Sequence, residues 1–281
     1  MALNMEYVSA EIAFIAENGD SAASYIYPKS SGREIKRPIN EKKVVRVHDT
    51  RRLEVPSTLE VNGFQLLNFP TRITDFYDER DIAENYYKEA IDLLKEVTGA
   101  AEVFVFDHTY RSEVRANAGQ PGVRLPAEFA HVDYTPSSGP RRSLEILREM
   151  NQREYIQHRM ALVNVWRPII GPVYDCPLAI CDPRTSSEED FVQTDIYHFN
   201  EDDLETPAIS GQIYSLRHNA SQRWYYCSEM RTEEVFLLRN WDSGVSDHSC
   251  YAAHTSFKNP IVPPQSKPRE SIELRTLLIF P

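Results

Sequence analysis

The sequence predicts a mainly β protein with supporting helices, built on a double-stranded β-helix, or jelly-roll, core. Short strand-like runs follow one another from residue 161 to the C-terminus, separated by loops rich in Pro, Asn, Asp, Ser and Gly, which is typical of a sandwich or barrel. Two helical patterns precede these runs. No linker divides the chain, so we expect one domain of residues 1–281, with an N-terminal extension (1–60) and a helix-backed jelly roll (61–281).

The first half of the chain combines strands with both helices. A helix is expected from the N-cap Asp78 to Gly99, because apolar residues recur at helical spacing between them. A second helix is expected to start near Pro140, which suits a first helical turn, and to continue in pieces to Met160. The polar stretch 30–60 is expected to be mostly irregular. The strands expected in this half are 10–15, 44–47, 64–69 and 101–106.

The second half is expected to consist almost entirely of strands. Each run is short and apolar or alternating, as half-buried and buried strands are. The expected strands are 161–166, 178–180, 191–197, 211–216, 224–227, 235–238, 251–257 and 271–280.

Composition is typical of a soluble globular protein. Of the 281 residues 41% are hydrophobic and 26% charged, and the formal net charge is −11. No apolar run approaches a membrane span, and residues 1–7 lack the pattern of a signal peptide, so we expect a cytoplasmic protein without a membrane partner. The acidic balance also argues against nucleic acid as a partner, and the basic stretch 33–52 is expected to be a solvated surface. A homodimer is left open.

The four cysteines are expected to be reduced, buried thiols. They are too few for a disulfide scaffold. Cys176 and Cys181 lie close in sequence, but no second cysteine pair completes a zinc site with them.

The feature that points to chemistry is His131-Val132-Asp133. In an extended strand, residues i and i+2 point to the same face, so an imidazole and a carboxylate project side by side. A distant histidine would complete a facial triad of two histidines and one carboxylate, which leaves coordination positions open on Fe(II). His-x-Asp alone is a weak signal, although it occurs once here and His-x-Glu does not occur.

Three histidines compete for the third ligand position. His254 lies in a strand-like run and is favoured. His218 lies at a predicted hairpin turn and His248 in a predicted loop, where side chains usually face solvent. His108 is interpreted as a core histidine with satisfied hydrogen bonds, with a direct role in the site as the alternative.

The C-terminal region and several further motifs resemble a known family. His254 is followed by a proline-rich loop and then by Arg269-Glu270-Ser271, an order that resembles iron- and 2-oxoglutarate-dependent oxygenases. Over about residues 60–281 the chain resembles the fungal and bacterial family named for a cephamycin methoxylation protein, a gibberellin desaturase and AsaB. The motifs that carry this resemblance are 106–109, 130–135, 164–168, 177–182, 223–226 and 253–257.

The resemblance implies a set of cofactors and ligands. Fe(II) would be held by His131, Asp133 and His254, and the reaction would use 2-oxoglutarate and O2. In such enzymes an arginine forks onto the distal carboxylate of 2-oxoglutarate and a serine assists, roles that match Arg269 and Ser271. The loop between His254 and Arg269 is longer than in many related oxygenases.

Other residues remain candidates for the co-substrate site. Arg275 rivals Arg269, because its even offset would place both on one face of a regular strand. Asn164 and Arg167 either approach the co-substrate or form a structural strand end.

The resemblance also implies a function, with alternatives. We expect a dioxygenase that oxidises a small hydrophobic secondary metabolite, most specifically by forming an endoperoxide on a fungal meroterpenoid, a terpenoid substrate. Hydroxylation or desaturation of another metabolite is one alternative, and a non-catalytic jelly-roll partner subunit is another. A cupin-like metal enzyme without 2-oxoglutarate is disfavoured, because such sites usually contain His-x-His and none occurs here.

Overall fold

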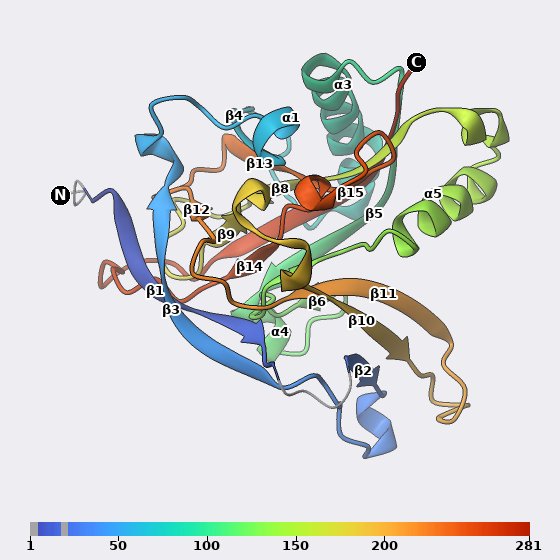
Figure 1. Ribbon diagram of the computed structural model, residues 1–281, viewed down its shortest axis with the longest axis horizontal. Helices are drawn as coiled ribbons and strands as arrows, with labels where there is room; N and C mark the ends of the chain where they lie inside the picture. The colour runs from blue at the N-terminus through green and yellow to red at the C-terminus, as the bar shows by residue number, and fades with distance from the viewer. Residues whose placement is uncertain (1–4, 18–21) are drawn as a thin grey trace.

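Two β-sheets form the core of the protein, as the computed structural model shows (Figure 1). It describes residues 5–17 and 22–281; residues 1–4 and 18–21, within the predicted N-terminal extension, lie outside the described residues. The larger sheet has nine strands, in the order β1-β3-β12-β9-β14-β7-β11-β10-β2, and the smaller has six, in the order β4-β13-β8-β15-β5-β6. The predicted mainly β, jelly-roll class is confirmed.

The strands of each sheet come from distant parts of the sequence. The nine-stranded sheet contains β1 (Tyr7–Ile15), β2 (Ala23–Ile26), β3 (Asn40–Asp49), β7 (His131–Val132), β9 (Leu178–Cys181), β10 (Phe191–His198), β11 (Ile209–Leu216), β12 (Trp224–Tyr226) and β14 (His254–Ser256). The six-stranded sheet contains β4 (Phe64–Asn68), β5 (Glu102–Ser112), β6 (Val123–Arg124), β8 (Met160–Pro168), β13 (Glu234–Asp242) and β15 (Glu270–Ile279).

Helices are few and lie outside the sheets. The α-helices are α1 (Leu59–Asn62), α2 (Glu79–Asp81), α3 (Tyr87–Thr98), α4 (Glu113–Asn117) and α5 (Ser138–Glu149), and a π-helical segment, η3 (Ile82–Tyr86), joins α2 to α3. Short 3-10 turns are η1 (Lys29–Ser31), η2 (Thr50–Arg52), η4 (Arg153–Gln157), η5 (Pro183–Thr185), η6 (Glu188–Asp190) and η7 (His248–Cys250).

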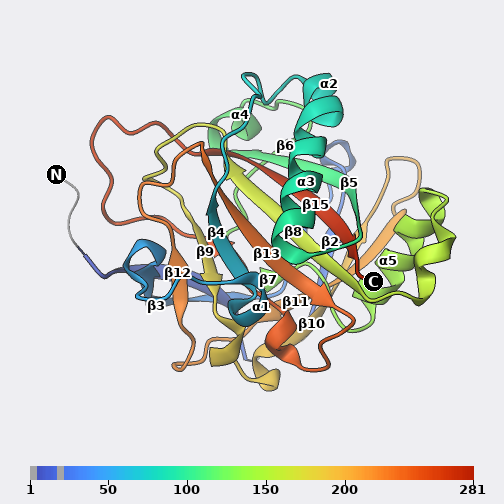
Figure 2. The same ribbon diagram turned by 90° about the horizontal axis from the view of Figure 1, so that it is seen from above.

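The first predicted helix is confirmed at both ends. The Asp78 side chain accepts hydrogen bonds from the backbone N–H groups of Arg80 and Asp81, which caps the helix start. Gly99 adopts a left-handed conformation with φ of 69°, which ends α3. The α3 helix covers the outer face of the six-stranded sheet (Figure 2).

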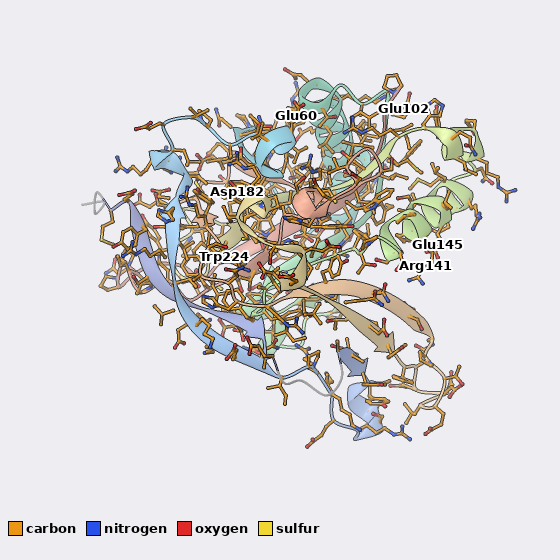
Figure 3. The ribbon with its side chains drawn as sticks, viewed as in Figure 1. Glu60, Glu102, Arg141, Glu145, Asp182 and Trp224 are labelled. Carbon is orange, nitrogen blue, oxygen red and sulfur yellow. The ribbon has the colours of Figure 1, made fainter. Side chains whose placement is uncertain are left out.

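The second predicted helix is also present. The α5 helix contains Pro140 in its first turn and ends at Glu149, and the short turn η4 then leads to β8. Arg141 and Glu145 form an exposed pair on its surface, 3.9 Å apart (Figure 3).

Side-chain alternation gives the six-stranded sheet two different faces. On β8, Val163 and Val165 pack outward in the same apolar cluster as Leu94 of α3. Asn164 and Trp166 therefore point inward, toward the nine-stranded sheet. The inner face of this sheet is where polar side chains collect around the candidate site.

Two β-bulges change which side chains reach this inner face. The register between β15 and β5 shifts so that Arg275 is opposite Asp107 and the next pair is Thr276 with Val105. Phe106 is therefore the extra residue, and both Phe106 and Asp107 line the inner cleft. A similar shift between Arg239 and Trp241 leaves Asn240 of β13 unpaired in the ladder with β8.

Two predictions about elements were wrong in extent. The stretch 30–60 is not mostly irregular, because β3 runs from Asn40 to Asp49 and pairs with β1 along nine residues. The strand was not predicted in full because alternate side chains of β3 are exposed and several of its residues are charged. The strand expected at 251–257 is only β14, His254–Ser256.

Two further expectations concern cysteines and membrane spans. All four cysteines are buried and free, as expected. Within the described residues, no helix is both long and apolar enough to cross a bilayer.

Candidate metal centre and adjoining cleft

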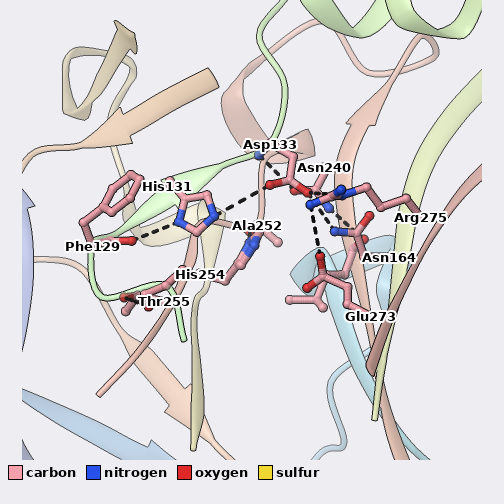
Figure 4. A network of polar contacts seen from close by, with 12 residues as sticks. Phe129, His131, Asp133, Asn164, Asn240, Ala252, His254, Thr255, Glu273 and Arg275 are labelled. Carbon is pink, nitrogen blue, oxygen red and sulfur yellow. Dashed lines mark hydrogen bonds and ion pairs between the residues drawn. The ribbon is translucent and has the colours of Figure 1, made fainter. Parts of the chain in front are cut away.

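Two neighbouring strands bring His131 and His254 together. β7 and β14 are antiparallel, and His131 lies directly opposite His254. Their ring centroids are 4.6 Å apart. Asp133 follows directly after β7, and its Oδ1 lies 3.6 Å from His131 Nε2 (Figure 4). In residues 5–17 and 22–281, these are the one group of three or more His, Cys, Asp or Glu side chains placed to share a metal, with ligand atoms within 4.8 Å of one another.

Backbone carbonyls fix the tautomer of both histidines. His131 Nδ1 lies 2.9 Å from the carbonyl of Phe129, and His254 Nδ1 lies 3.1 Å from that of Ala252. A carbonyl only accepts hydrogen bonds, so each Nδ1 donates and each Nε2 keeps a free lone pair. Two such imidazoles and one carboxylate form the donor set that suits non-haem Fe(II), so the residues present fit this metal.

Asp133 is held from three sides. Asn164 Nδ2 donates to its Oδ2 at 2.9 Å, and Arg275 Nε lies 3.5 Å from the same oxygen. The backbone N–H of Asp133 donates to Oδ1 of the bulged Asn240 at 3.3 Å. The carboxylate is thus oriented with its other oxygen toward His131.

Electrostatics favour the metal-binding protonation states of Asp133 and His131. Burial alone would raise the pKa of Asp133, but the charge of Arg275, then the two imidazoles and the Asn164 hydrogen bond, hold it well below its usual range. Burial, followed by the nearby His254, lowers the pKa of His131 to about 3. At neutral pH the carboxylate is therefore ionised and this imidazole neutral, the forms that bind metal.

A small cavity lies beside the two histidines. Trp166 of β8, Glu273 of β15 and Arg269, which directly precedes β15, form its far side. The complete lining is Arg111, Ala127, His131, Trp166, Leu178, His254, Thr255, Ser256, Arg269 and Glu273.

Arg269 is a buried cation with a free donor. It is 3% exposed, its Nη1 donates to the Cys176 carbonyl at 2.8 Å, and its guanidinium lies 5.6 Å from the Trp166 ring centroid. Its Nε has no hydrogen-bond partner. Burial lowers the pKa of Arg269, so the charged form is costly until an anion enters the cavity.

The remaining candidates from the sequence occupy different places. Ser271 is buried on β15 between Arg269 and Glu273, and alternation directs it to the same inner face. Arg275 and Asn164 contact Asp133, as described above. The structure does not bring Arg167 to the cavity.

Arg167 has a structural role on the opposite face of β8. It is fully buried and donates to the Tyr86 hydroxyl and to the carbonyls of Phe69 and Thr232, at 2.9, 2.6 and 2.6 Å. Its odd offset from Asn164 explains this, since residues three apart on a strand face opposite ways.

The other histidines singled out from the sequence lie away from His131, Asp133 and His254, the candidate ligands, which we call the metal group. His218 packs against Phe14, with ring centroids 5.2 Å apart, and His248 packs against Phe191 at 6.0 Å. His108 bonds to the Tyr87 hydroxyl at 2.7 Å through Nδ1. Its Nε2 lies 3.1 Å from Glu79 Oε2, so both ring nitrogens have partners, although the side chain is only partly buried and is not in the core.

Three residues near the site were not singled out from the sequence. Glu273 lies two residues after Ser271, so strand alternation could have found it. Arg111 reaches the cavity because β5 pairs with β15, where it is opposite Ser271. Asn240 has no such signal, since only the bulge in β13 turns it toward Asp133.

A wide cleft opens from the metal group along the inner side of the nine-stranded sheet. It shares Arg111, Ala127, His131 and Ser256 with the small cavity, so the two are continuous. Its walls include residues of β1, β2, β10 and β11 and, on the other side, Phe106, Asp107 and Tyr134. A metal bound by His131 and Asp133 would face a space large enough for an organic substrate.

Known proteins resemble this chain over most of its length. Residues 12–279 match the family described as "Oxidoreductase/YMDC permease-like domain". The Fe(II)/2-oxoglutarate-dependent dioxygenase nvfI of Aspergillus novofumigatus is 33% identical over 83% of this chain and 82% of its own length. The hydroxylase/desaturase efuI of Hormonema carpetanum is 29% identical over 97% and 95%.

Solved structures agree with these sequence relatives. A structure of the iron and alpha-ketoglutarate-dependent endoperoxidase NvfI matches with a TM-score of 0.83 and 28% identity, covering 99% of both chains. Relatives of this kind use Fe(II), 2-oxoglutarate and O2, and the donor set described above suits that iron. The chain therefore belongs to the family of Fe(II)/2-oxoglutarate-dependent dioxygenases and is an oxidoreductase of that class.

Proposed function

We propose that His131, Asp133 and His254 hold the catalytic Fe(II). The observation that carries this proposal is their convergence, with ligand atoms within 4.8 Å of one another and both Nε2 atoms free. Two histidines and one carboxylate occupy only part of the coordination sphere of Fe(II), which leaves room for the co-substrate and O2.

We assign the distal carboxylate of 2-oxoglutarate to Arg269, with Ser271 assisting. Arg269 offers a buried cation with an unpartnered Nε in the cavity beside the histidines. Arg275 is less suited, because its guanidinium is already placed between Asp107 and Asp133. We give Arg275 and Asn164 the role of orienting Asp133.

The proposed reaction is the oxidation of a small hydrophobic secondary metabolite. Bound Fe(II) and 2-oxoglutarate supply the activation of O2, and the protein positions the substrate in the cleft and excludes water. Endoperoxide formation on a terpenoid of the meroterpenoid class is the specific proposal, supported by the similarity to NvfI, which is named an endoperoxidase. Hydroxylation or desaturation is the second candidate, favoured by the similarity to efuI, which is named a hydroxylase/desaturase.

Succinate formation tests the assignment. The purified protein, supplied with Fe(II), 2-oxoglutarate and O2, should form succinate, and His254→Ala should abolish this. His218→Ala is the matched control and should keep wild-type turnover, because His218 packs against Phe14 and not at the site. A protein that binds no Fe(II) and forms no succinate, even with candidate terpenoids added, would instead be a non-catalytic partner subunit.

We also propose that residues 1–281 act as one unit in the cytoplasm. β1 and β3 of the N-terminal extension join the same sheet as β7 and β14, which carry the two histidines. The four buried free thiols suit a reducing compartment. Cell fractionation tests the location, and size-exclusion chromatography with light scattering distinguishes a monomer from a homodimer.

A further inference from the structure

The wide cleft is cationic in a protein that is acidic as a whole. The chain has 31 lysines and arginines against 42 aspartates and glutamates. The cleft reverses this balance, because seven lysines and arginines line it against four carboxylates. The cations are Arg37, Lys42, Arg111, Arg124, Arg142, Lys258 and Arg275, and the carboxylates are Glu11, Asp107, Glu128 and Asp133.

Most of these cations already have partners within the protein. Arg275 contacts Asp107 and Asp133, and Arg111 donates to the Leu125 carbonyl at 2.7 Å. The other partnered cations are Lys42 with Glu11, Arg142 with Glu145 and Glu149, and Lys258 with Glu113. Carboxylates therefore compensate the charges of Arg275, Lys42, Arg142 and Lys258, whereas the partner of Arg111 is a neutral carbonyl.

Arg37 and Arg124 are different. Both side chains are exposed, and within the described part of the chain neither guanidinium makes an ion pair or a hydrogen bond. Both arginines line the cleft, and no carboxylate of the described residues neutralises their charges.

Strand pairing places these two arginines at the same end of the cleft. Lys36, next to Arg37, bridges to Tyr25 of β2, and the following residue of β2, Ile26, is paired with His198 of β10. Arg124 is close enough to His198 that its charge adds to the effect of burial in lowering the pKa of that imidazole. Arg37 and Arg124 therefore both lie near His198, and the backbone of Arg124 also pairs with that of Arg111, which reaches the small cavity.

Along β10, His198 and the neighbouring Arg37 lie far from the level of the metal group. Ser215 of β11 is opposite both His131 and Val192, so Val192 marks the level of the metal group on β10. His198 is six residues farther along β10, which at ~3.3 Å per residue is about 20 Å of strand.

Apolar side chains lie between the two ends. Ile196 of β10 and Ile213 of β11 line this stretch together with the polar Thr194 and Ser215, and Ile26 and Leu125 extend the apolar surface beside His198 and Arg124. A ligand that fills the cleft thus meets hydrophobic surface between the metal group and the free arginines.

We propose that the substrate is an amphipathic acid whose carboxylate is bound by Arg37 and Arg124 while its apolar body reaches the iron. The inference rests on the proposed function for the position of the oxidised carbon, and it adds the charge of the substrate and two residues that select it. Arginine suits the task, because its planar fork binds a carboxylate through paired hydrogen bonds.

A pair of fluorescent probes tests the charge preference. The probes are 11-(dansylamino)undecanoic acid and its methyl ester, which share an apolar chain and differ in the carboxylate. Each is titrated into the protein loaded with Fe(II) and 2-oxoglutarate under anaerobic conditions. The acid should bind at least about tenfold more tightly than the ester, and added salt should reduce the difference.

Substitutions of Arg37 and Arg124 test whether these residues cause the preference for the acid over the ester. Arg37→Gln and Arg124→Gln should each weaken binding of the acid about fivefold and leave the ester unchanged, and Arg37→Glu/Arg124→Glu together should remove the preference. Arg153→Glu, an exposed arginine outside both cavities, is the matched control and should change neither probe. Equal binding of acid and ester to the wild type, or an unchanged ratio in the double variant, would overturn the proposal.

The same samples test the proposed function and the charge of the substrate separately. The visible absorption band of an Fe(II)–2-oxoglutarate complex reports the proposed metal and co-substrate site independently of the probes. If the band appears without a preference for the acid, only the inference about the substrate fails. If the preference for the acid appears without the band, the proposed function fails and the anion site remains.

Discussion

The guanidinium of Arg275 contacts three carboxylates, with Nε 3.5 Å from Asp133 Oδ2, Nη1 2.7 Å from Asp107 Oδ2 and Nη2 3.8 Å from Glu273 Oε1. Asp107 is in this position because the bulge in β5 adds Phe106 to the strand. The bulge therefore connects the register of the six-stranded sheet to the orientation of a proposed iron ligand. Residues that contact a metal ligand without binding the metal themselves typically tune the affinity for that metal.

Replacing Arg275 should weaken iron binding more than co-substrate binding. In Arg275→Ala, Asp133 loses a charge that holds its carboxylate ionised and oriented, so the affinity for Fe(II) should fall roughly 10- to 100-fold. Anaerobic titration with Fe(II), followed by the KM for 2-oxoglutarate at saturating iron, measures both effects. A large rise in that KM with unchanged iron affinity would instead make Arg275 the carboxylate binder.

Replacing Arg269 should have the reverse effect. Arg269→Ala removes the buried cation of the small cavity, so the KM for 2-oxoglutarate should rise roughly 100-fold, about 2–3 kcal/mol of binding. Fe(II) affinity should remain near that of the wild type, because Arg269 does not contact the three proposed ligands. Arg269→Lys should recover only part of the loss, since an ammonium lacks the planar fork.

Gly139 should be intolerant of any side chain. A Cβ at this position in α5 would lie 2.6 Å from Cγ of Trp241 on β13, so Gly139→Ala forces the helix away from the sheet. We expect a loss of roughly 1–3 kcal/mol in the free energy of unfolding, measured with urea. Gly211→Ala is the control, because a Cβ there meets no atom within 4 Å, and it should leave stability nearly unchanged.

The stability of the metal-free protein should fall in mild acid. The pKa of His131 is about 3 in the folded protein and about 6.5 when unfolded, so between these values the unfolded chain binds more protons. Protonation of His131 in the unfolded chain therefore lowers the free energy of unfolding below about pH 6.5. The loss is roughly 2 kcal/mol between pH 7 and pH 5.

Urea unfolding at the two pH values measures this dependence. His131→Asn should show a smaller decline, because the substituted side chain does not titrate. The lowered pKa values of His48 and His198 should preserve part of the slope. A wild-type free energy of unfolding that stays constant from pH 7 to pH 5 would contradict the neutral, buried state of His131.

Local patterns in the sequence were sufficient for much of the fold. The helix from Asp78 to Gly99 was predictable because its caps and apolar spacing are local features. The same holds for the buried strands of the second half, and the His131-x-Asp133 pair stood out for a similar reason. The metal role of these residues stays a prediction.

Features that depend on register were not predictable. Which arginine contacts Asp133 depends on the bulge opposite Arg275, and nothing in the local sequence marks that bulge. Asn240 reaches Asp133 for the same kind of reason. Arg167 is a different case, because its odd offset from Asn164 already argued against a shared face.

Anaerobic titration of the metal-free protein with Fe(II) in the presence of 2-oxoglutarate is the most direct test of the central claim. A visible charge-transfer band should appear, saturate at one iron per chain and be lost in Asp133→Ala. A band of wild-type intensity in that variant, or no band in the wild type, would contradict the assignment of Asp133 as an iron ligand.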